Sequence, residues 1–380
     1  MNITSKLPSV GTTIFTTMSM LAKEHNAINL SQGFPNFPSD QRLIELVSKA
    51  MNKGYNQYAP MLGVMSLREA IATKFQKLYN TSYQPENEIV VTSGATQAIY
   101  TAISAFIRPG DEVIMFNPAY DCYEPAVTVN GGKTISIQLM HPDYAVNWNE
   151  VQQAINENTK MIIVNTPQNP SGSTFTKKDM QQLEHLVKDS NIIVLSDEVY
   201  EHMVYDGETH QSACLFPGLK ERTLITASFG KTFHNTGWKV GYCCGPKELM
   251  KEFVKVHQFT VFCVHHPVQI ALATYLENEN HYLYLPEFFQ KKRDLFLEAI
   301  AGSRFTFKPT KATYFQSLSY HDISEDGDQD FAKELTTKYG VASIPLSVFN
   351  SNQLDFKALR FCFAKTDETL LKAAEILNKI

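Results

Sequence analysis

The segment from Ser228 to Gly241, SFGKTFHNTGWKVG, carries the side chains best suited to chemistry. An apolar run that predicts a strand leads into a glycine and a lysine, Lys231, and Lys239 follows eight positions later. A lysine amine can attack carbonyl carbons and can act as a general base. Gly230-Lys231-Thr232 also resembles the end of a P-loop, but that motif requires glycine where this chain has Ile225. Taken alone, the segment favours the simpler interpretation of a solvent-exposed loop lysine.

Length and composition restrict the class of protein. A chain of 380 residues is long enough for two or three domains. Its 43% hydrophobic and 19% charged residues are typical of a soluble globular protein, and a net charge of -5 gives no electrostatic basis for binding nucleic acid or an anionic membrane. No apolar run predicts a membrane span, and residues 1–10 lack the apolar core of a signal peptide. The six scattered cysteines, without a Cys-x-x-Cys pair, favour a reduced, cytoplasmic location and no metal site.

From residue 89 onward, short β-rich runs alternate with stretches of helical periodicity. This alternation predicts an α/β protein with a mostly parallel sheet that is sandwiched by helices. In such sheets, ligands bind beyond the carboxyl ends of the strands. The predicted strands are Ile89–Thr92, Glu112–Phe116, Thr134–Ile137, Met161–Asn165, Ile192–Ser196 and Thr223–Ser228, with helices such as Thr96–Ile107 and Lys177–Val187 between them.

The pattern changes near residue 246 and predicts a second, smaller α+β domain. We expect the large domain to comprise 45–280, and the small domain to combine 1–44 with 281–380. A capping box at Ser66–Glu69 predicts the start of a helix that runs to about Leu78. The later elements are predicted as helices around 247–276 and 287–301, a strand at Thr313–Ser319, a helix at Asp328–Tyr339, a strand at Leu359–Phe363 and a helix from Asp367.

Two of the predicted strands end in loops that can bind a ligand. Thr92-Ser93-Gly94-Ala95-Thr96 leads directly into a helix, whose free amides and neighbouring hydroxyls can bind an anion such as phosphate. The alternative is an ordinary helix N-cap. Asn165–Gly172, NTPQNPSG, can fix an amide side chain on a rigid turn, although asparagine, proline and glycine also dominate surface turns.

The run Ser196–Tyr200, SDEVY, places an acid directly after an apolar strand. Such a carboxylate is buried and needs a cationic or hydrogen-bonding partner, either in a ligand or in a structural ion pair. Tyr120 offers an aromatic face, and Arg360 lies in an apolar strand, where a guanidinium usually pairs with a carboxylate or phosphate. Pyridoxal 5'-phosphate bound to an amino acid satisfies most of this set, with Lys231 as the nucleophile.

Eight motifs occur in the order in which they occur in the fold-type I, class I and II aminotransferases, and the chain therefore resembles this family. Within the family, it resembles the methionine aminotransferases and the kynurenine aminotransferase/glutamine transaminase K enzymes. The resemblance covers nearly the whole chain. The motifs are SQGFPNFP at 31–38, NQYAP at 56–60, SGATQA at 93–98, NPAYDCYEP at 117–125, NTPQNPSG at 165–172, SDEVYEHMVYDG at 196–207, SFGKTFHNTGWKVGY at 228–242 and RFCFAK at 360–365.

The resemblance implies a role for each matching residue at the cofactor. Lys231 forms a Schiff base with the cofactor aldehyde and moves the substrate α-proton. Asp197 pairs with the ring nitrogen, while Tyr200 and Asn169 hydrogen-bond the phenolic oxygen. The phosphate site and ring contacts comprise Gly94, Ala95, Thr96, Ser228, Lys239, Tyr120 and, from a neighbouring subunit, Tyr58.

For the substrate, the resemblance implies that Arg360, Asn169 and the backbone of Gly33 bind the carboxylate. Phe15 and the partner chain's counterpart of Phe262 surround the substrate side chain. This chain departs from the kynurenine-type enzymes, which carry tryptophan at the position of Phe15 and histidine at that of Cys263. The remaining pocket fits an unbranched apolar side chain, and methionine packs well against aromatic rings.

The implied enzyme is a homodimer with shared active sites that moves the amino group of an apolar, sulfur-containing or aromatic amino acid to a 2-oxo acid in two half-reactions. A C–S β-lyase, or a transaminase that prefers kynurenine or glutamine, would use the same scaffold. A cofactor-binding regulator would require a DNA-binding module or a basic patch. A Rossmann dehydrogenase would require a G-x-G-x-x-G turn, and none follows a predicted strand.

Overall fold

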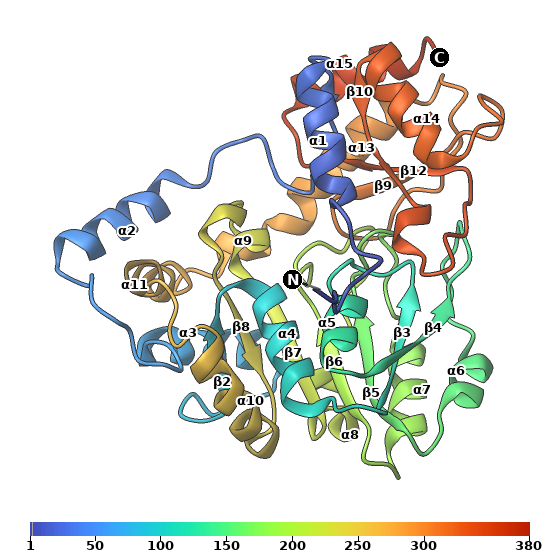
Figure 1. Ribbon diagram of the computed structural model, residues 1–380. Helices are drawn as coiled ribbons and strands as arrows, with labels where there is room; N and C mark the ends of the chain where they lie inside the picture. Colours follow the sequence, from blue (N-terminus) through green and yellow to red (C-terminus); the bar gives the residue numbers. More distant parts are fainter. Residues whose placement is uncertain (2) are drawn as a thin grey trace.

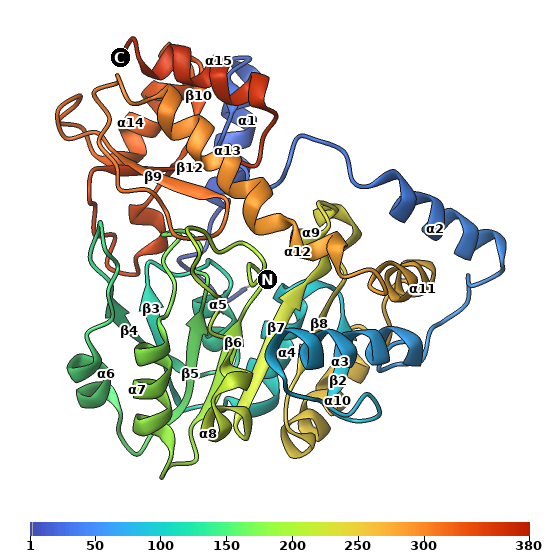
Figure 2. The same ribbon diagram turned by 180° about the vertical axis from the view of Figure 1, so that it is seen from behind.

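The computed structural model describes residue 1 and residues 3–380. A large sheet lies between two layers of helices, and a smaller part built from both ends of the chain lies beyond one edge of this sandwich (Figures 1 and 2). The first helix, α1 (Ile14–Glu24), packs on β10 (Val341–Ala342). None of the helices in the described residues is long and apolar enough to cross a membrane.

The large sheet confirms the predicted parallel architecture. Its strand order is β2-β8-β7-β6-β5-β3-β4, and all pairings are parallel except those of β8, which runs antiparallel to both of its neighbours. All six predicted strands are present, but β8 was not predicted, because its sequence GYCC lacks β-branched residues. The strands are β2 (Ile89–Thr92), β3 (Glu112–Asn117), β4 (Lys133–Gln138), β5 (Thr159–Asn165), β6 (Ile193–Asp197), β7 (Thr223–Ser228) and β8 (Gly241–Cys244).

Helices cover both faces of this sheet, because side chains on successive strand residues point to opposite sides. In β6, Ile193 and Leu195 join one buried cluster, while Val194 joins the other. The helices α4 and α5 lie over the face toward the viewer in Figure 1, and α3 and α7 lie over the other face in Figure 2. The helices of this part are α2 (Gln41–Asn52), α3 (Met65–Tyr79), α4 (Gly94–Phe106), α5 (Tyr123–Val129), α6 (Trp148–Ala154), α7 (Lys177–Val187), α8 (Pro217–Lys220), α9 (Phe229–Thr232), α10 (Lys247–Thr260) and α11 (His266–Tyr275).

The smaller part contains a three-stranded antiparallel sheet of order β11-β12-β9. The short strand β1 (Ile28–Asn29) pairs in parallel with β10, so the N-terminal segment joins the C-terminal region, as predicted. The division into 45–280 and 1–44 with 281–380 remains a prediction. The other elements are β9 (Phe315–Ser319), β11 (Ile344–Pro345), β12 (Ala358–Cys362), α12 (Asn280–Leu283), α13 (Leu285–Ala299), α14 (Asp328–Glu334), α15 (Asp367–Leu377) and the short turns η1 (Ala213–Leu215), η2 (Thr236–Trp238), η3 (Leu335–Tyr339) and η4 (Ser347–Phe349).

The helix predicted around 247–276 is two helices. The chain breaks after α10, where Phe262 adopts a left-handed φ of 66°, and α11 begins again with a proline in its first turn. A left-handed residue ends a helix, and a proline in the first turn favours a new start. The apolar periodicity continues across the break, and so it could not reveal the interruption.

The capping box predicted at Ser66 is wrong. Helix α3 begins at Met65, its N-cap residue is Val64, and no side chain caps it. The amide of Val64 donates to Gln269 Oε1 at 2.9 Å, so a side chain from α11 satisfies a backbone group that a local cap would otherwise take.

Gly63 packs against the central sheet and provides a test of this packing. A Cβ at Gly63 would lie 2.7 Å from Val91 Cβ, whereas one at Gly54 would meet nothing within 4 Å. Both glycines have left-handed φ angles, +99° and +88°, so alanine costs about 1 kcal/mol of backbone strain at either site. We predict that Gly63→Ala lowers the unfolding free energy by about 1–3 kcal/mol more than Gly54→Ala, measured by thermal and urea unfolding. Equal losses in the two variants would contradict the packing.

Candidate active site

A cavity opens at the carboxyl ends of β5, β6 and β7, where the topology places ligands. It encloses about 660 Å³ of space not filled by atoms, part of it open to solvent. Ten of the predicted site residues line it together. The lining comprises Gly94, Ala95, Thr96, Ile99, Tyr120, Asn165, Asn169, Asp197, Val199, Tyr200, Ser228, Lys231, Thr236 and Lys239.

Lys231 lies on α9, the single helical turn that follows β7. Its Nζ donates to the carbonyl oxygen of Gly33 at 2.9 Å and lies 5.8 Å from the ring centre of Tyr200 and 5.6 Å from that of Tyr314. Burial lowers the pKa of Lys231 to about 8. The amine is therefore not an exposed loop lysine, and it loses its proton more readily than an ordinary lysine does, as a nucleophile or base requires.

Asp197 ends β6 and is 3% exposed. The hydroxyl of Tyr123 donates to Asp197 Oδ2 at 2.6 Å, and the amide of Val199 donates to Oδ1 at 3.3 Å. Among the described residues, no lysine or arginine forms an ion pair with this carboxylate, which excludes a structural ion pair as the reason for its burial. Burial raises the pKa of Asp197 to about 6, so the site favours an added cation beside it.

The first turn of α4 and the ammonium of Lys239 lie together, where the sequence predicts an anion site. Ser93 makes no side-chain capping bond, so the alternative of an ordinary serine N-cap is wrong. A Cβ on Gly94 would lie 3.4 Å from Lys239 Nζ, and a Cβ on Gly241 would lie 3.1 Å from the Gly94 carbonyl carbon. Because both positions are glycine, the helix N-terminus and the lysine can converge on one anion.

Arg360 is fully buried on β12, and its planar face stacks 3.9 Å from the ring centre of Phe315. Nη1 donates to Asn169 Oδ1 at 2.7 Å, Nη2 donates to the carbonyl oxygen of Ser31 at 2.9 Å, and Nε has no partner. Burial lowers the pKa of Arg360 to about 10. No carboxylate in the described residues pairs with it, so this guanidinium is suited to an anionic ligand.

Asn169 and Tyr200 are held on the cavity wall. Asn169 is 7% exposed, and its amide donates to Asn165 Oδ1 at 2.9 Å, so the NTPQNPSG segment is not a surface turn. Tyr200 is 2% exposed. Tyr120 lines the cavity and contacts Tyr123 edge to face at 5.8 Å between ring centres.

Comparison with known proteins decides the family. The family model described as "Aminotransferase class I and II" matches residues 25–377. The chain belongs to the class I and II aminotransferases. A methionine aminotransferase from Escherichia coli is 46% identical over 99% of this chain and 98% of its own. The human kynurenine–oxoglutarate transaminase 1 is 32% identical over 94% of this chain and 93% of its own.

Solved structures give the same family and the same fold. The crystal structure of Escherichia coli YbdL, for which a methionine aminotransferase function was identified, has a TM-score of 0.98 at 46% identity and covers 100% of both chains. The N-succinyldiaminopimelate aminotransferase from Mycobacterium tuberculosis has a TM-score of 0.96 at 33% identity, also over 100% of both chains. The aminotransferase fold-type I architecture predicted from the motifs is therefore confirmed.

Five of the expected site residues are not among those that line the cavity of this aminotransferase. Arg360 and Gly33 hydrogen-bond lining residues, and Phe15 lies beside Arg360, but Tyr58 and Phe262 lie on the surface. Tyr58 is 82% exposed and Phe262 is 45% exposed, and their rings meet edge to face at 5.5 Å on the surface. Their contribution to a neighbouring subunit's site remains a prediction. Phe15 lies beside Arg360, the residue expected to bind the substrate carboxylate. Its ring centre is 5.3 Å from the guanidinium carbon of Arg360 and 5.9 Å from the ring centre of Phe349.

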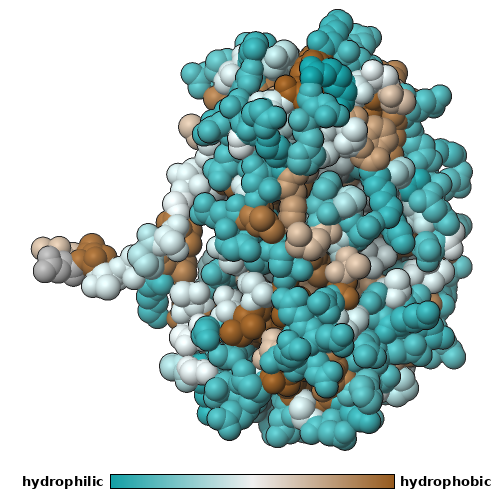
Figure 3. Space-filling view, turned by 90° about the vertical axis from the view of Figure 1, so that its right-hand side faces the viewer, coloured by the Kyte–Doolittle hydropathy of each residue, from teal (hydrophilic) through white to brown (hydrophobic). Residues whose placement is uncertain are grey.

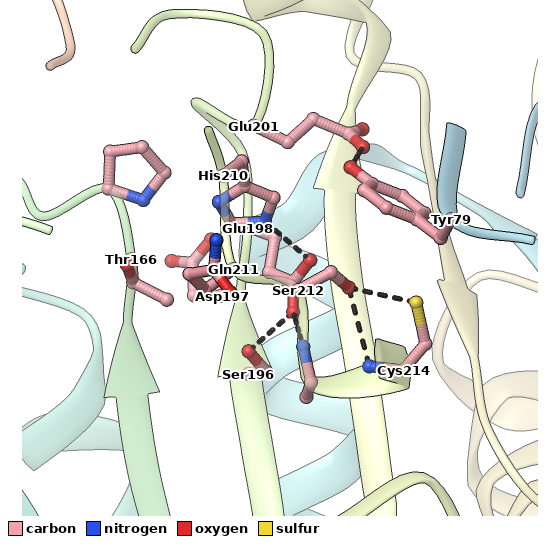
Figure 4. Close-up of polar contacts among 12 residues, drawn as sticks. Tyr79, Thr166, Ser196, Asp197, Glu198, Glu201, His210, Gln211, Ser212 and Cys214 are labelled. Carbon is pink, nitrogen blue, oxygen red and sulfur yellow. Dashed lines mark hydrogen bonds and ion pairs between the residues drawn. The ribbon is translucent and has the colours of Figure 1, made fainter. Parts of the chain in front are cut away.

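Three buried residues around this site were not predicted: Tyr123, Tyr314 and Glu198. Tyr123 follows Tyr120 by three positions in NPAYDCYEP, a helical spacing that could have placed both on one side. Tyr314 donates to Gly33 O at 2.6 Å. Glu198 accepts from Ser196 Oγ at 2.8 Å and from the amide of Ala213 at 3.0 Å, and its other oxygen contacts His210 Nε2 at 2.9 Å (Figure 4). Its satisfied carboxylate anchors the loop that follows Asp197.

The raised pKa of Asp197 predicts a dependence of stability on pH. An acid whose pKa rises on folding, here from 3.8 to about 6, stabilises the folded state at low pH and loses that contribution as the pH rises through 6. In the ligand-free protein, the Asp197→Asn variant has no titratable group at this position, so it lacks this loss of stability as the pH rises. We predict that the parent loses about 2 kcal/mol more unfolding free energy than Asp197→Asn between about pH 4.5 and pH 7.5, measured by urea unfolding. Parallel pH profiles would contradict the assigned pKa shift.

Proposed function

We propose that this aminotransferase uses pyridoxal 5'-phosphate to move the amino group of an apolar L-amino acid, with methionine favoured, to a 2-oxo acid in a ping-pong reaction. The observation that supports it best is one cavity lined by a lysine of lowered pKa and a buried carboxylate without a cation. A buried guanidinium without an anion, that of Arg360, hydrogen-bonds Asn169 on the wall of this cavity. A phosphorylated pyridine aldehyde and an amino-acid carboxylate together supply the missing partners.

The residues present fit the cofactor. The carboxylate of Asp197 lacks an internal cation and would hold a protonated ring nitrogen, and the ring of Tyr120 would stack on the pyridine. Tyr200 and Asn169 would donate to the phenolic oxygen. The phosphate would be held by the cradle that the glycine at position 94 leaves open, which comprises Gly94, Ala95, Thr96, Ser228 and Lys239.

The bound cofactor supplies an electron sink for the charge that develops when the substrate α-carbon loses its proton. The protein supplies position and proton transfer. Arg360 and Asn169 hold the substrate carboxylate, which fixes the α-carbon relative to Lys231. The free amine of Lys231 accepts the α-proton and then donates it back, and a pKa of about 8 allows both roles near neutral pH.

Aromatic side chains near Arg360 favour the proposal that the substrate has an apolar side chain. Phe15 and Phe349 contact each other and surround Arg360, so a side chain beside the carboxylate meets rings and not cations. The most similar relative reported above is a methionine aminotransferase, and a thioether packs well on aromatic rings. The kynurenine transaminases lie at lower identity, about 32%, in agreement with the replacement of their tryptophan by Phe15.

We also propose a homodimer whose subunits complete each other's sites. Tyr58 and Phe262 are large, exposed and in mutual contact, and Phe259, three residues before Phe262 in the chain, is 85% exposed. Exposed aromatic residues in one patch are typical of protein interfaces. A second copy placed on this patch would bring Tyr58 to its phosphate site and Phe262 to its substrate pocket.

A substrate panel tests the reaction. We predict that the enzyme with pyridoxal 5'-phosphate transfers the amino group of L-methionine with a kcat/KM about a hundredfold above that of L-aspartate, because an acidic side chain would be desolvated among aromatic rings. Lys231→Ala, which removes the base, should lower turnover about a thousandfold or more and abolish the Schiff-base absorbance. Products are measured by chromatography, with L-kynurenine and L-glutamine as further donors.

Other results of this panel would contradict the proposal. Normal transamination by Lys231→Ala would exclude the assigned role of the lysine. Equal use of aspartate and methionine would contradict the apolar pocket. Release of pyruvate and ammonia from cystathionine in the absence of any 2-oxo acid would favour the C–S β-lyase.

Subunit mixing tests the shared site. Tyr58→Ala and Lys231→Ala should each be nearly inactive alone, because one lacks the group donated to its neighbour and the other lacks its own base. In co-expressed heterodimers, one of the two sites contains both native residues, so we predict that the purified heterodimer recovers about half of the parent activity. Activity is assayed after purification by two different affinity tags. Heterodimers as inactive as the single variants would show that Tyr58 serves its own chain or none.

A further inference from the structure

Four consecutive backbone carbonyls, those of residues 31–34, accept hydrogen bonds from side chains far away in the sequence. We call residues 31–34 the strap. The strap lies beside Arg360, and its donors come from three parts of the chain: Lys231 after β7, Tyr314 before β9, and Arg360 and Lys365 on and just after β12. The bonds run from Arg360 Nη2 to Ser31 O at 2.9 Å, from Lys365 Nζ to Gln32 O at 3.3 Å and to Phe34 O at 2.7 Å, and from Lys231 Nζ and Tyr314 Oη to Gly33 O at 2.9 and 2.6 Å.

Lys365 is the charged donor in this set to which the proposed reaction assigns no role. It follows β12 closely and is 3% exposed, and the ring of Phe34 lies 5.0 Å from its Nζ. No carboxylate in the described residues forms an ion pair with it. A buried ammonium is costly unless its donors are satisfied, so the two strap carbonyls are its principal partners. The strap and Lys365 therefore stabilise each other.

Gly33 lies between the two residues that Lys365 holds. A Cβ at Gly33 would lie 2.8 Å from Phe315 Cζ, so the strap passes close to the ring that stacks on Arg360. The same segment reaches the side-chain pocket, because Gln32 Nε2 donates to the carbonyl oxygen of Phe15 at 2.8 Å. A displacement of the strap would thus alter the carboxylate site and the aromatic pocket together.

We propose that Lys365 is a positioning residue for the amino-acid substrate: by holding the carbonyls of Gln32 and Phe34, it fixes the Gly33 backbone beside Arg360 where the substrate carboxylate binds. This role rests on the proposed aminotransferase function. It goes further by assigning a task to a buried lysine that touches neither the cavity lining nor the reacting atoms. Lys231 does not depend on it, since Tyr314 still holds Gly33 O.

The test is Lys365→Met, which keeps the length and apolar stem of the side chain and removes the charge. Hydrogen bonds to charged groups differ from neutral ones by enough to change affinity about tenfold or more. We expect KM for L-methionine to rise about tenfold or more while kcat stays within about twofold of the parent, because binding is weakened equally in the ground and transition states. The assay uses the enzyme loaded with pyridoxal 5'-phosphate.

Lys292→Met is the matched control. Lys292 is also a buried lysine of the smaller part, 9% exposed, and its Nζ lies 3.0 Å from Asp367 Oδ1 and near the rings of Phe37 and Phe288. None of its hydrogen bonds reaches the strap. It should lower stability without raising KM, which separates the loss of a buried lysine from the loss of strap positioning.

Binding without turnover provides a second measurement. 3-Phenylpropionate carries a carboxylate and an aromatic ring but no amino group, so its affinity for the loaded enzyme reports the carboxylate site and the aromatic pocket without any chemical step. Calorimetry should show its Kd raised by the same factor as KM in Lys365→Met and unchanged in Lys292→Met. If Lys365→Met does not fold, Phe34→Ala serves instead: its ring is 45% exposed, and its removal admits water to the ammonium and should raise Kd by a smaller factor.

The outcomes separate this inference from the proposed function. A parent enzyme that does not transaminate any amino acid would overturn the function itself. The positioning role would be overturned if the parent transaminates but Lys365→Met leaves both KM and the Kd of 3-phenylpropionate unchanged. The same holds for Phe34→Ala if that variant replaces Lys365→Met. A fall in kcat without a rise in KM would overturn the positioning role as well, because that result would place Lys365 in the chemical step.

Discussion

The desolvation of charge governs this site. Asp197 and Arg360 are both removed from water, and each is held by neutral hydrogen-bonding groups and not by an opposite charge. A buried charge without a counter-charge is costly, and both pKa values shift toward the neutral forms as a result. Ligands that carry the opposite charges relieve this cost. The rest of the fold excludes water from these two charged groups and holds them at fixed positions.

Other buried charges in the same region show the contrast. Glu201 is as buried as Asp197, but Lys74 pairs with it and Tyr79 and Tyr242 contribute hydroxyl groups. Although burial raises the pKa of Glu201, the attraction of Lys74 outweighs it and holds that pKa well below its usual value. Such a satisfied network stabilises the fold and needs no ligand. Figure 4 shows part of this network beside Asp197, where Glu198 also has its full set of partners.

The two ends of the chain meet at the site. The strap comes from the N-terminal segment, and Arg360 and Lys365 come from the C-terminal region, while Lys231 belongs to the central sheet. The pairing of β1 with β10 brings the N-terminal segment into this position. Ahead of it, the described segment from Ile3 onward extends away from the body of the molecule, and Ile3 is 82% exposed (Figure 3). The proposed substrate site therefore depends on contacts between segments more than three hundred residues apart.

The sequence by itself determined the alternation of strands and helices, the identity of the lysine, the acid and the arginine, and the family, because local periodicity and ordered motifs are written in neighbouring residues. Tertiary structure decided the rest. It showed that Asp197 has no internal cation while Glu201 has one, although both acids stand in the same motif. It replaced the Ser66 cap with Gln269 and broke the helix at Phe262. It also revealed Tyr123, Tyr314 and Lys365 as parts of the site's support, because partners distant along the chain meet only when the fold has formed.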